Sequence, residues 1–225
     1  MAEAPDFLVG VLGGTPAFGA SAEAYRFGHW RFAGGGRLEI LEPTGHDGFL
    51  HRFLARHGPG VHHVTFKVPS LRRACQRAEE RGYQIVGYDD SNPAWQEAFL
   101  HPRQALGLVV QLAESSGGGG GTPGFALPSG PPDPPPPVTV VGLRLRARSR
   151  ERAVMQWQEV LRGQAGHDAS GALIYRWPRS ALRLAVEIDA SQDEGPIAIE
   201  VTSERALSLA GGPHPVLGAV FRAVS

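Results

Sequence analysis

The second half of this 225-residue chain repeats the first half in diverged form. The matching segments are 61–74 with 140–153, 37–42 with 183–188, and 107–112 with 218–223. The first pair of segments aligns without a gap, and in this alignment Ser70 corresponds to Ser149. Each serine stands just before a predicted helix, where serine is a favoured N-cap. A recurring segment of this kind is the signature of a repeated supersecondary unit. The two halves are therefore expected to share one architecture.

A change in composition separates the halves. Residues 115–137 are rich in glycine first, from Gly117 to Gly121, and rich in proline last. Glycine makes a connecting segment flexible and proline makes it stiff and extended. The sequence thus predicts two domains, 1–114 and 138–225, with 115–137 as the linker.

Residues 61–68 read as a strand, since they are rich in β-branched and aromatic residues and follow a Gly-Pro-Gly turn. Side chains alternate between the two faces of a strand. The polar face would carry His63, Thr65 and Lys67, and the core face would carry Val64, Phe66 and Val68. His62 is expected on the opposite face from His63. A half-buried strand with solvent on its polar face explains the same pattern, so the run alone does not establish a ligand site.

The segments around this strand predict an α+β module. Ser70 caps a helix over residues 71–81 that Gly82 closes. Strands are predicted at 85–88, 97–101 and 108–112, which completes the order strand, helix, three strands from 61 to 114. The earlier part of the chain predicts the end of a helix at 6–12, strands at 25–32 and 37–41, and a short helix at 48–57. Residues 6–42 therefore resemble the same module without its first strand.

Charge and cysteine content exclude several classes of protein. Lys plus Arg equals Asp plus Glu at 22 each, which gives no electrostatic case for binding nucleic acid or an anionic membrane. No apolar run approaches the length of about 20 residues that spans a bilayer, and no signal peptide is evident, so a cytoplasmic protein is expected. The single cysteine, Cys75, excludes an internal disulfide framework and is expected to face the core of its helix.

Three separated motifs, in this order, resemble the vicinal oxygen chelate superfamily. They are Gly36-Arg-Leu-Glu-Ile-Leu-Glu-Pro-Thr-Gly45, Gly58-Pro-Gly-Val-His-His-Val-Thr-Phe-Lys-Val68, and Ala98-Phe-Leu-His-Pro102 followed by Gly107-Leu-Val-Val-Gln111. The resemblance is greatest to the glyoxalase and methylmalonyl-CoA epimerase branch. It covers nearly all of 7–114, whereas in 138–225 it rests on the internal repeat. It implies paired βαβββ modules that form a cupped mixed sheet, in two tandem copies.

The same resemblance implies a divalent metal held by Glu39, His63 and Gln111, with Glu39 as the catalytic base. Carboxylate, imidazole and amide oxygen suit Zn, Ni, Co, Mn or Fe. Considered one at a time, each residue also has a structural explanation. Glu39 could be a glutamate on the surface of a strand, and Gln111 could be a core amide that bonds to the backbone. The substrate pocket would include Trp95, Phe99 and His101, although structural roles explain these residues as well, as they do His29.

The implied site is incomplete in two respects. A fourth ligand is expected on the first strand of module one, which precedes the predicted helix end at 6–12. An upstream start, a second chain as in a homodimer, or the second domain could supply that strand. In the second half the corresponding positions hold Gly142, Ala185 and Arg222, so 138–225 is expected to lack this metal site and to cover the first domain.

Two functions remain open on the sequence. One is a glyoxalase-like, metal-dependent enzyme of the lyase or isomerase type, in which the metal stabilises an enolate and Glu39 transfers a proton next to a carbonyl. The other is a non-catalytic protein that binds a small molecule or an antibiotic in the same fold. Both take a small-molecule ligand and neither involves nucleic acid or a membrane.

Overall fold

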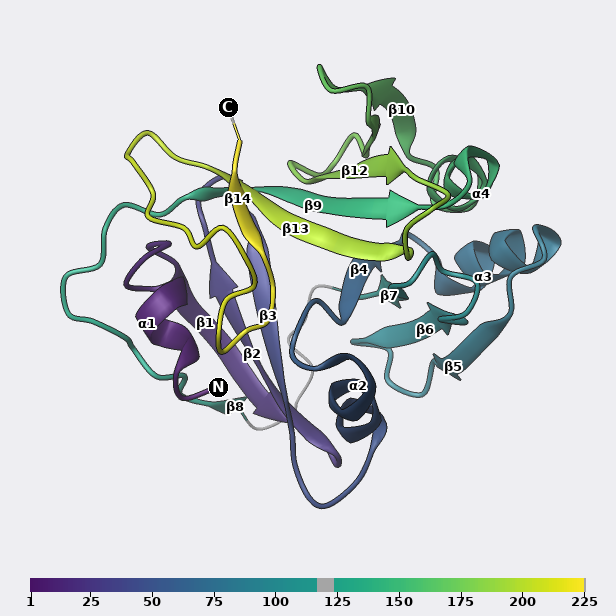
Figure 1. Cartoon of the computed structure of the whole chain (residues 1–225). Helices are drawn as coiled ribbons and strands as arrows, with labels where there is room; N and C mark the ends of the chain where they lie inside the picture. The colour runs from purple at the N-terminus through teal and green to yellow at the C-terminus, as the bar shows by residue number, and fades with distance from the viewer. Residues whose placement is uncertain (117–123, 225) are drawn as a thin grey trace. The chain divides into compact units, whose positions relative to one another are not determined.

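The structure is a computed structural model that describes residues 1–116 and 124–224 (Figure 1). These residues fall into two compact units, and each unit takes segments from both halves of the sequence. The first unit comprises residues 1–60, 122–142 and 198–225, and the second comprises 61–121 and 143–197. The predicted domains 1–114 and 138–225 remain a prediction about how the modules are grouped. The glycine run Gly117–Gly121 lies outside the described residues.

The second unit contains a complete module of strand, helix and three strands. Its elements are β4 (His63–Lys67), α3 (Leu71–Glu80), β5 (Ile85–Asp89), β6 (Gln96–Leu100) and β7 (Val109–Glu114). The sheet order is β4-β7-β6-β5, in which β4 and β7 are parallel and the other neighbours are antiparallel. The first strand thus lies beside the last, and the predicted α+β fold of βαβββ modules is confirmed.

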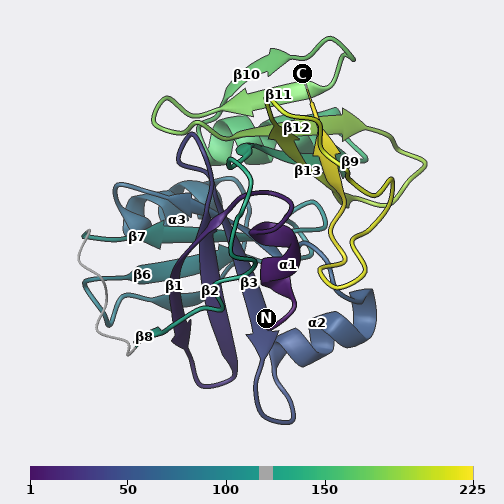
Figure 2. The same ribbon diagram turned by 90° about the vertical axis from the view of Figure 1, so that its left-hand side faces the viewer.

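Helix α3 forms for the reasons expected from its sequence. The Ser70 Oγ accepts a hydrogen bond from the Arg73 N–H and so satisfies one of the free donors of the first turn. The helix buries Leu71, Ala74, Cys75 and Ala78 on one face. Figure 2 shows α3 running alongside the strands of its sheet. Burial raises the pKa of the Cys75 thiol to about 11, as expected for a core residue that is not a nucleophile.

Removal of this cap is expected to weaken the fold by a measurable amount. Ser70→Ala leaves an N–H of the first turn without its partner and should lower the free energy of unfolding by about 0.5–2 kcal/mol in urea titrations. Ser149 makes the same bond to the Arg152 N–H, so Ser149→Ala should have a similar effect. The exposed Ser208 serves as the control. If Ser70→Ala and Ser208→Ala had equal effects, the cap would not contribute to stability.

The order strand, helix, three strands occurs a second time. The elements are β9 (Thr139–Ala147), α4 (Arg150–Val154), η1 (Met155–Val160), β10 (Gln164–His167), β11 (Leu173–Arg176) and β12 (Arg183–Ile188). Their sheet order is β10-β11-β12-β9, and β9 belongs to the second unit from Leu143 onward. The helix changes at Met155 from α to π geometry, and Trp157 of this π turn is fully buried. Phe66 of β4 packs against Trp157 and Trp177, so both modules share one core.

In the described residues the first unit holds a module of one helix and three strands: α1 (Ala4–Leu8), β1 (Thr15–Ser21), β2 (Tyr25–Arg31) and β3 (Arg37–Pro43). The unit also contains α2 (Phe49–His57), β8 (Gly124–Phe125), β14 (Phe221–Ala223) and parts of β9 and β13 (Gly195–Thr202). The sheet order is β3-β2-β1-β8, which leaves β3 at an edge, and β13 pairs with β14 in parallel. Strand β1 was not predicted. Its sequence contains proline and glycine, and its pairing with β2 shifts register between Pro16 and Phe18.

Helix α1 differs from the prediction in its boundary. It ends at Leu8, and hydrogen-bonded turns continue as far as Gly14. Phe7 packs against Phe221, with ring centroids 4.8 Å apart, and against His214 at 4.3 Å. The proline-rich end of the predicted linker lies on the turn after α1, where a side chain on Gly13 would meet the carbonyl oxygen of Pro135 at 2.3 Å. In the described ranges every helix is too short or too polar to cross a membrane.

Candidate functional site

Glu39 and His29 form a hydrogen-bonded pair on one face of the β1–β3 sheet. The two residues lie directly opposite each other on β3 and β2, and His29 Nε2 bonds to Glu39 Oε2. Each side chain is 26% exposed, so the pair is accessible from solvent. The sequence left two roles open for His29, one in the pocket and one in the structure. Its contact with the predicted base makes a carboxylate–imidazole pair, in which either group can take up a proton.

Aromatic rings surround this pair on the same strand face. Phe27 lies 5.5 Å from the His29 ring and Phe18 lies 6.3 Å from it, measured between centroids. Tyr25 is 6.2 Å from Phe27. Phe18 is 42% exposed, which is high for a large apolar side chain. The face therefore combines one carboxylate with accessible apolar surface, as small-molecule sites commonly do.

His63 and Gln111 lie on a common face of the β4–β7 pair. Thr65 is the direct neighbour of Gln111, and His63 lies two residues before Thr65 on the same face. Phe66 points to the opposite face and its aromatic contacts, as the alternation predicts. The opposite face expected for His62 stays a prediction. Its Nδ1 lies 3.3 Å from Nδ1 of His63, and its carbonyl accepts from the Val109 N–H, next to the first residue of β4.

A hydrogen-bonded chain crosses this face from β4 to β6. The Thr65 hydroxyl donates to Oε1 of Gln111 at 2.5 Å, and Nε2 of Gln111 donates to Oε2 of Glu97 at 2.6 Å. The Trp95 indole N–H donates to the same Glu97 oxygen at 2.7 Å. Glu97 was missed from sequence, although it lies two residues before Phe99 in β6 and so shares its face.

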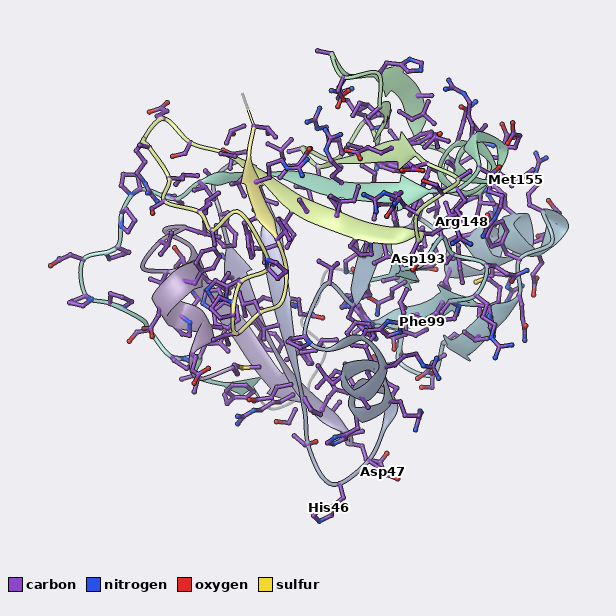
Figure 3. All side chains as sticks on the ribbon, viewed as in Figure 1. His46, Asp47, Phe99, Arg148, Met155 and Asp193 are labelled. Carbon is purple, nitrogen blue, oxygen red and sulfur yellow. The ribbon has the colours of Figure 1, made fainter. Side chains whose placement is uncertain are left out.

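The predicted pocket residues have different roles. Trp95 is 36% exposed and also stacks with Lys67, whose Nζ lies 3.9 Å from the ring centroid. Phe99 lies opposite Gln111 on β6 and is labelled in Figure 3. His101 follows β6 and closes a turn, because its N–H donates to the Gln84 carbonyl and its Nδ1 accepts from the Arg103 N–H. Trp95 and Phe99 thus gather on the Gln111 face, whereas the described bonds of His101 are structural.

The predicted ligands fit a divalent metal in their chemistry. Imidazole, carboxylate and amide oxygen are ligands of borderline to hard divalent ions. Glu39 belongs to the first unit, and His63 and Gln111 belong to the second. Over residues 1–116 and 124–224, no three His, Cys, Asp or Glu side chains form a group that could hold a metal ion. The pair that one sheet face does bring together is His63 with the amide of Gln111.

The second βαβββ module carries an ion-pair cluster at the position that Thr65 holds in the first. Arg144, which aligns with Thr65, is only 7% exposed. Its guanidinium bonds to Asp168 at 2.8 Å and to Glu187 at 3.1 Å. Hydrogen bonds from the Ser170 hydroxyl and from Arg144 hold the pKa of Asp168 well below its usual range. These ion pairs join β9 to β12 and to the turn that follows β10.

Known proteins resemble this chain in sequence and in fold. Residues 1–99 match the family model of the Glyoxalase/Bleomycin resistance protein/Dioxygenase superfamily. The chain is 32% identical over 87 residues to the uncharacterised protein YqjC of Bacillus subtilis, an alignment that covers 38% of this chain and 62% of YqjC. It is 27% identical over 82 residues to an ethylmalonyl-CoA/methylmalonyl-CoA epimerase of Cereibacter sphaeroides, with 35% of this chain and 61% of that protein covered.

The match in structure extends further along the chain than the match in sequence. A triple mutant of 4-hydroxymandelate synthase from Streptomyces coelicolor superposes with a TM-score of 0.65 at 14% identity, over 90% of this chain and 67% of that one. At this identity the likeness concerns the fold alone. The chain spans about 60% of the length of the two curated relatives named above. Residues 1–99 therefore match the glyoxalase/bleomycin resistance/dioxygenase superfamily in sequence, and the likeness in fold extends beyond these residues.

Proposed function

We propose that this chain is a divalent-metal-dependent enzyme that moves a proton at a carbon next to a carbonyl group, with Glu39 as the base. The observation that carries the proposal is the hydrogen bond between Glu39 and His29 on an accessible strand face. The bond orients the carboxylate, and the imidazole is a second group that can hold a proton near the same carbon. The exposed ring of Phe18 offers apolar contact to an acyl chain.

The family resemblance implies Glu39, His63 and Gln111 as ligands. Of these, His63 and Gln111 share one sheet face of the second unit and would hold an ion that polarises the carbonyl oxygen. Three further roles involve no proton transfer by the side chain. Trp95 and Phe99 bind apolar parts of a substrate, and Gln111 offers an amide oxygen that cannot take up a proton. The epimerase relative supports a thioester such as methylmalonyl-CoA as the substrate class, because the hydrogen that such an enzyme moves is next to the thioester carbonyl.

The wild-type protein tests this proposal in heavy water. Incubated with methylmalonyl-CoA and added Co²⁺ or Mn²⁺, it should incorporate one deuterium next to the carbonyl faster than a protein-free control, as measured by mass spectrometry. Dialysis against a chelator should abolish the exchange, and returning the metal should restore it.

Binding without exchange would select the alternative function. If titration calorimetry shows that the thioester binds while no deuterium is incorporated in the presence of metal, the protein is a small-molecule-binding member of its superfamily. If exchange proceeds unchanged after chelation, the metal has no part in the reaction.

A further inference from the structure

Gln111 has two chemically different ends, and only one of them can bind a metal. The carbonyl oxygen of an amide accepts hydrogen bonds and can act as a ligand, whereas the NH₂ group only donates. The direction of the amide therefore decides whether Gln111 can serve in the proposed site. Its Oε1 lies 2.5 Å from the Thr65 hydroxyl and its Nε2 lies 2.6 Å from Glu97.

Glu97 admits a single direction of this amide. An ionised carboxylate has no proton to donate, so the end of Gln111 that faces it has to be the NH₂ group. The Trp95 indole N–H, 2.7 Å from the same oxygen, is a donor only and also requires Glu97 to accept. The Thr65 hydroxyl can donate or accept, and so it adapts to whichever end of Gln111 it meets.

We propose that Glu97 is the positioning residue of Gln111, which turns the amide oxygen away from the carboxylate and keeps it available as a metal ligand. This inference rests on the proposed function, because it gives Gln111 a role in metal binding. Groups that orient metal ligands typically contribute 10- to 100-fold to metal affinity. An apolar side chain at position 97 would offer no acceptor to the NH₂ group and would lose this selection.

The affinity of the full chain for Co²⁺, measured by titration calorimetry, tests the proposal. Glu97→Leu removes the acceptor that faces the Gln111 NH₂ group, and it should weaken binding by about 10- to 100-fold. Glu114→Leu is the matched control, because Glu114 lies on β7 and bonds to the Leu71 N–H at the start of α3. That variant should keep the wild-type affinity.

A double-mutant cycle separates positioning from a simple effect of charge. In a Gln111→Glu background the ligand has two equivalent oxygens and no direction to select. There Glu97→Leu should leave Co²⁺ affinity unchanged or raise it, since it relieves repulsion between two neighbouring carboxylates. Weakening by the same factor in both backgrounds would overturn the positioning role.

Failure of the proposed function would look different. If Gln111→Ala bound Co²⁺ as tightly as the wild type, or if the wild type bound none, the metal role of Gln111 would be wrong and the inference would fall with it. If the wild type bound Co²⁺ through Gln111 and Glu97→Leu did so equally well, only the role of Glu97 would be wrong.

Discussion

Glu39→Gln is expected to lower the rate of deuterium exchange into methylmalonyl-CoA by about 10²- to 10⁴-fold. The amide has nearly the shape of the carboxylate but cannot take up a proton at neutral pH. His29 would remain beside it and could still donate or accept one hydrogen bond, so the sheet should stay folded. The exchange rate, measured at saturating metal and substrate, is the readout.

Glu42→Gln provides the control on the same strand. Glu42 lies on the opposite face of β3 from Glu39 and accepts from Arg26 and from the Met1 amino group. Its replacement removes a carboxylate of the same type and should leave the exchange rate near the wild-type value. Equal losses in both variants would show that the effect comes from the strand rather than from a base at position 39.

Arg144→Ala should lower the free energy of unfolding by about 1–3 kcal/mol, because it leaves the half-buried carboxylate of Asp168 without its guanidinium partner. The Asp168 side chain is 15% exposed, so water replaces that partner poorly. Arg146, two residues along the same strand, is less deeply buried, and Arg146→Ala should cost less than about 1 kcal/mol. Urea titrations at neutral pH measure both. A cost for Arg144→Ala near that of Arg146→Ala would contradict a structural role for the cluster.

The same cluster predicts how stability responds to acid. The pKa of Asp168 is lower in the folded protein than in an unfolded chain, chiefly through its bonds to Ser170 and Arg144. Its contribution is therefore fully present above the ordinary aspartate pKa of about 4 and is lost as the pH falls from there through the lower folded-state value. Asp168→Asn should flatten the fall in unfolding free energy between about pH 5 and pH 2. If the unfolding free energy of Asp168→Asn fell with acid as steeply as that of the wild type, Asp168 would not be the group that causes the fall.

The sequence predicted elements where local chemistry and periodicity agree. Helix α3 has a capping serine, a buried face of small residues and a glycine after its end, and it lies where those signals put it. The side chains of β4 alternate between the two faces of the sheet, as its sequence predicts. Strand β1 could not be predicted in the same way, because its pairing is set by β2 and not by the propensities of Pro16 or Gly19.

Side-chain partners were harder to predict than strand faces. The faces of Glu39 and Gln111 follow from alternation. Their partners His29 and Glu97 lie on neighbouring strands, and the amino-acid sequence does not reveal the register in which those strands pair. Arg144 illustrates the same limit. Its burial follows from acidic partners 24 and 43 residues away, which the local sequence does not indicate.

The packing of Phe7 against Phe221 has a consequence for biosynthesis. The two rings are roughly 200 residues apart in the chain. A ribosome adds about 5–20 residues per second, so Phe221 is made some 10–40 s after Phe7. During that interval the nascent first unit lacks β14 and leaves apolar surface of α1 uncovered. Chains released early by a premature stop would stay in that condition, which makes them targets for aggregation and proteolysis rather than functional fragments.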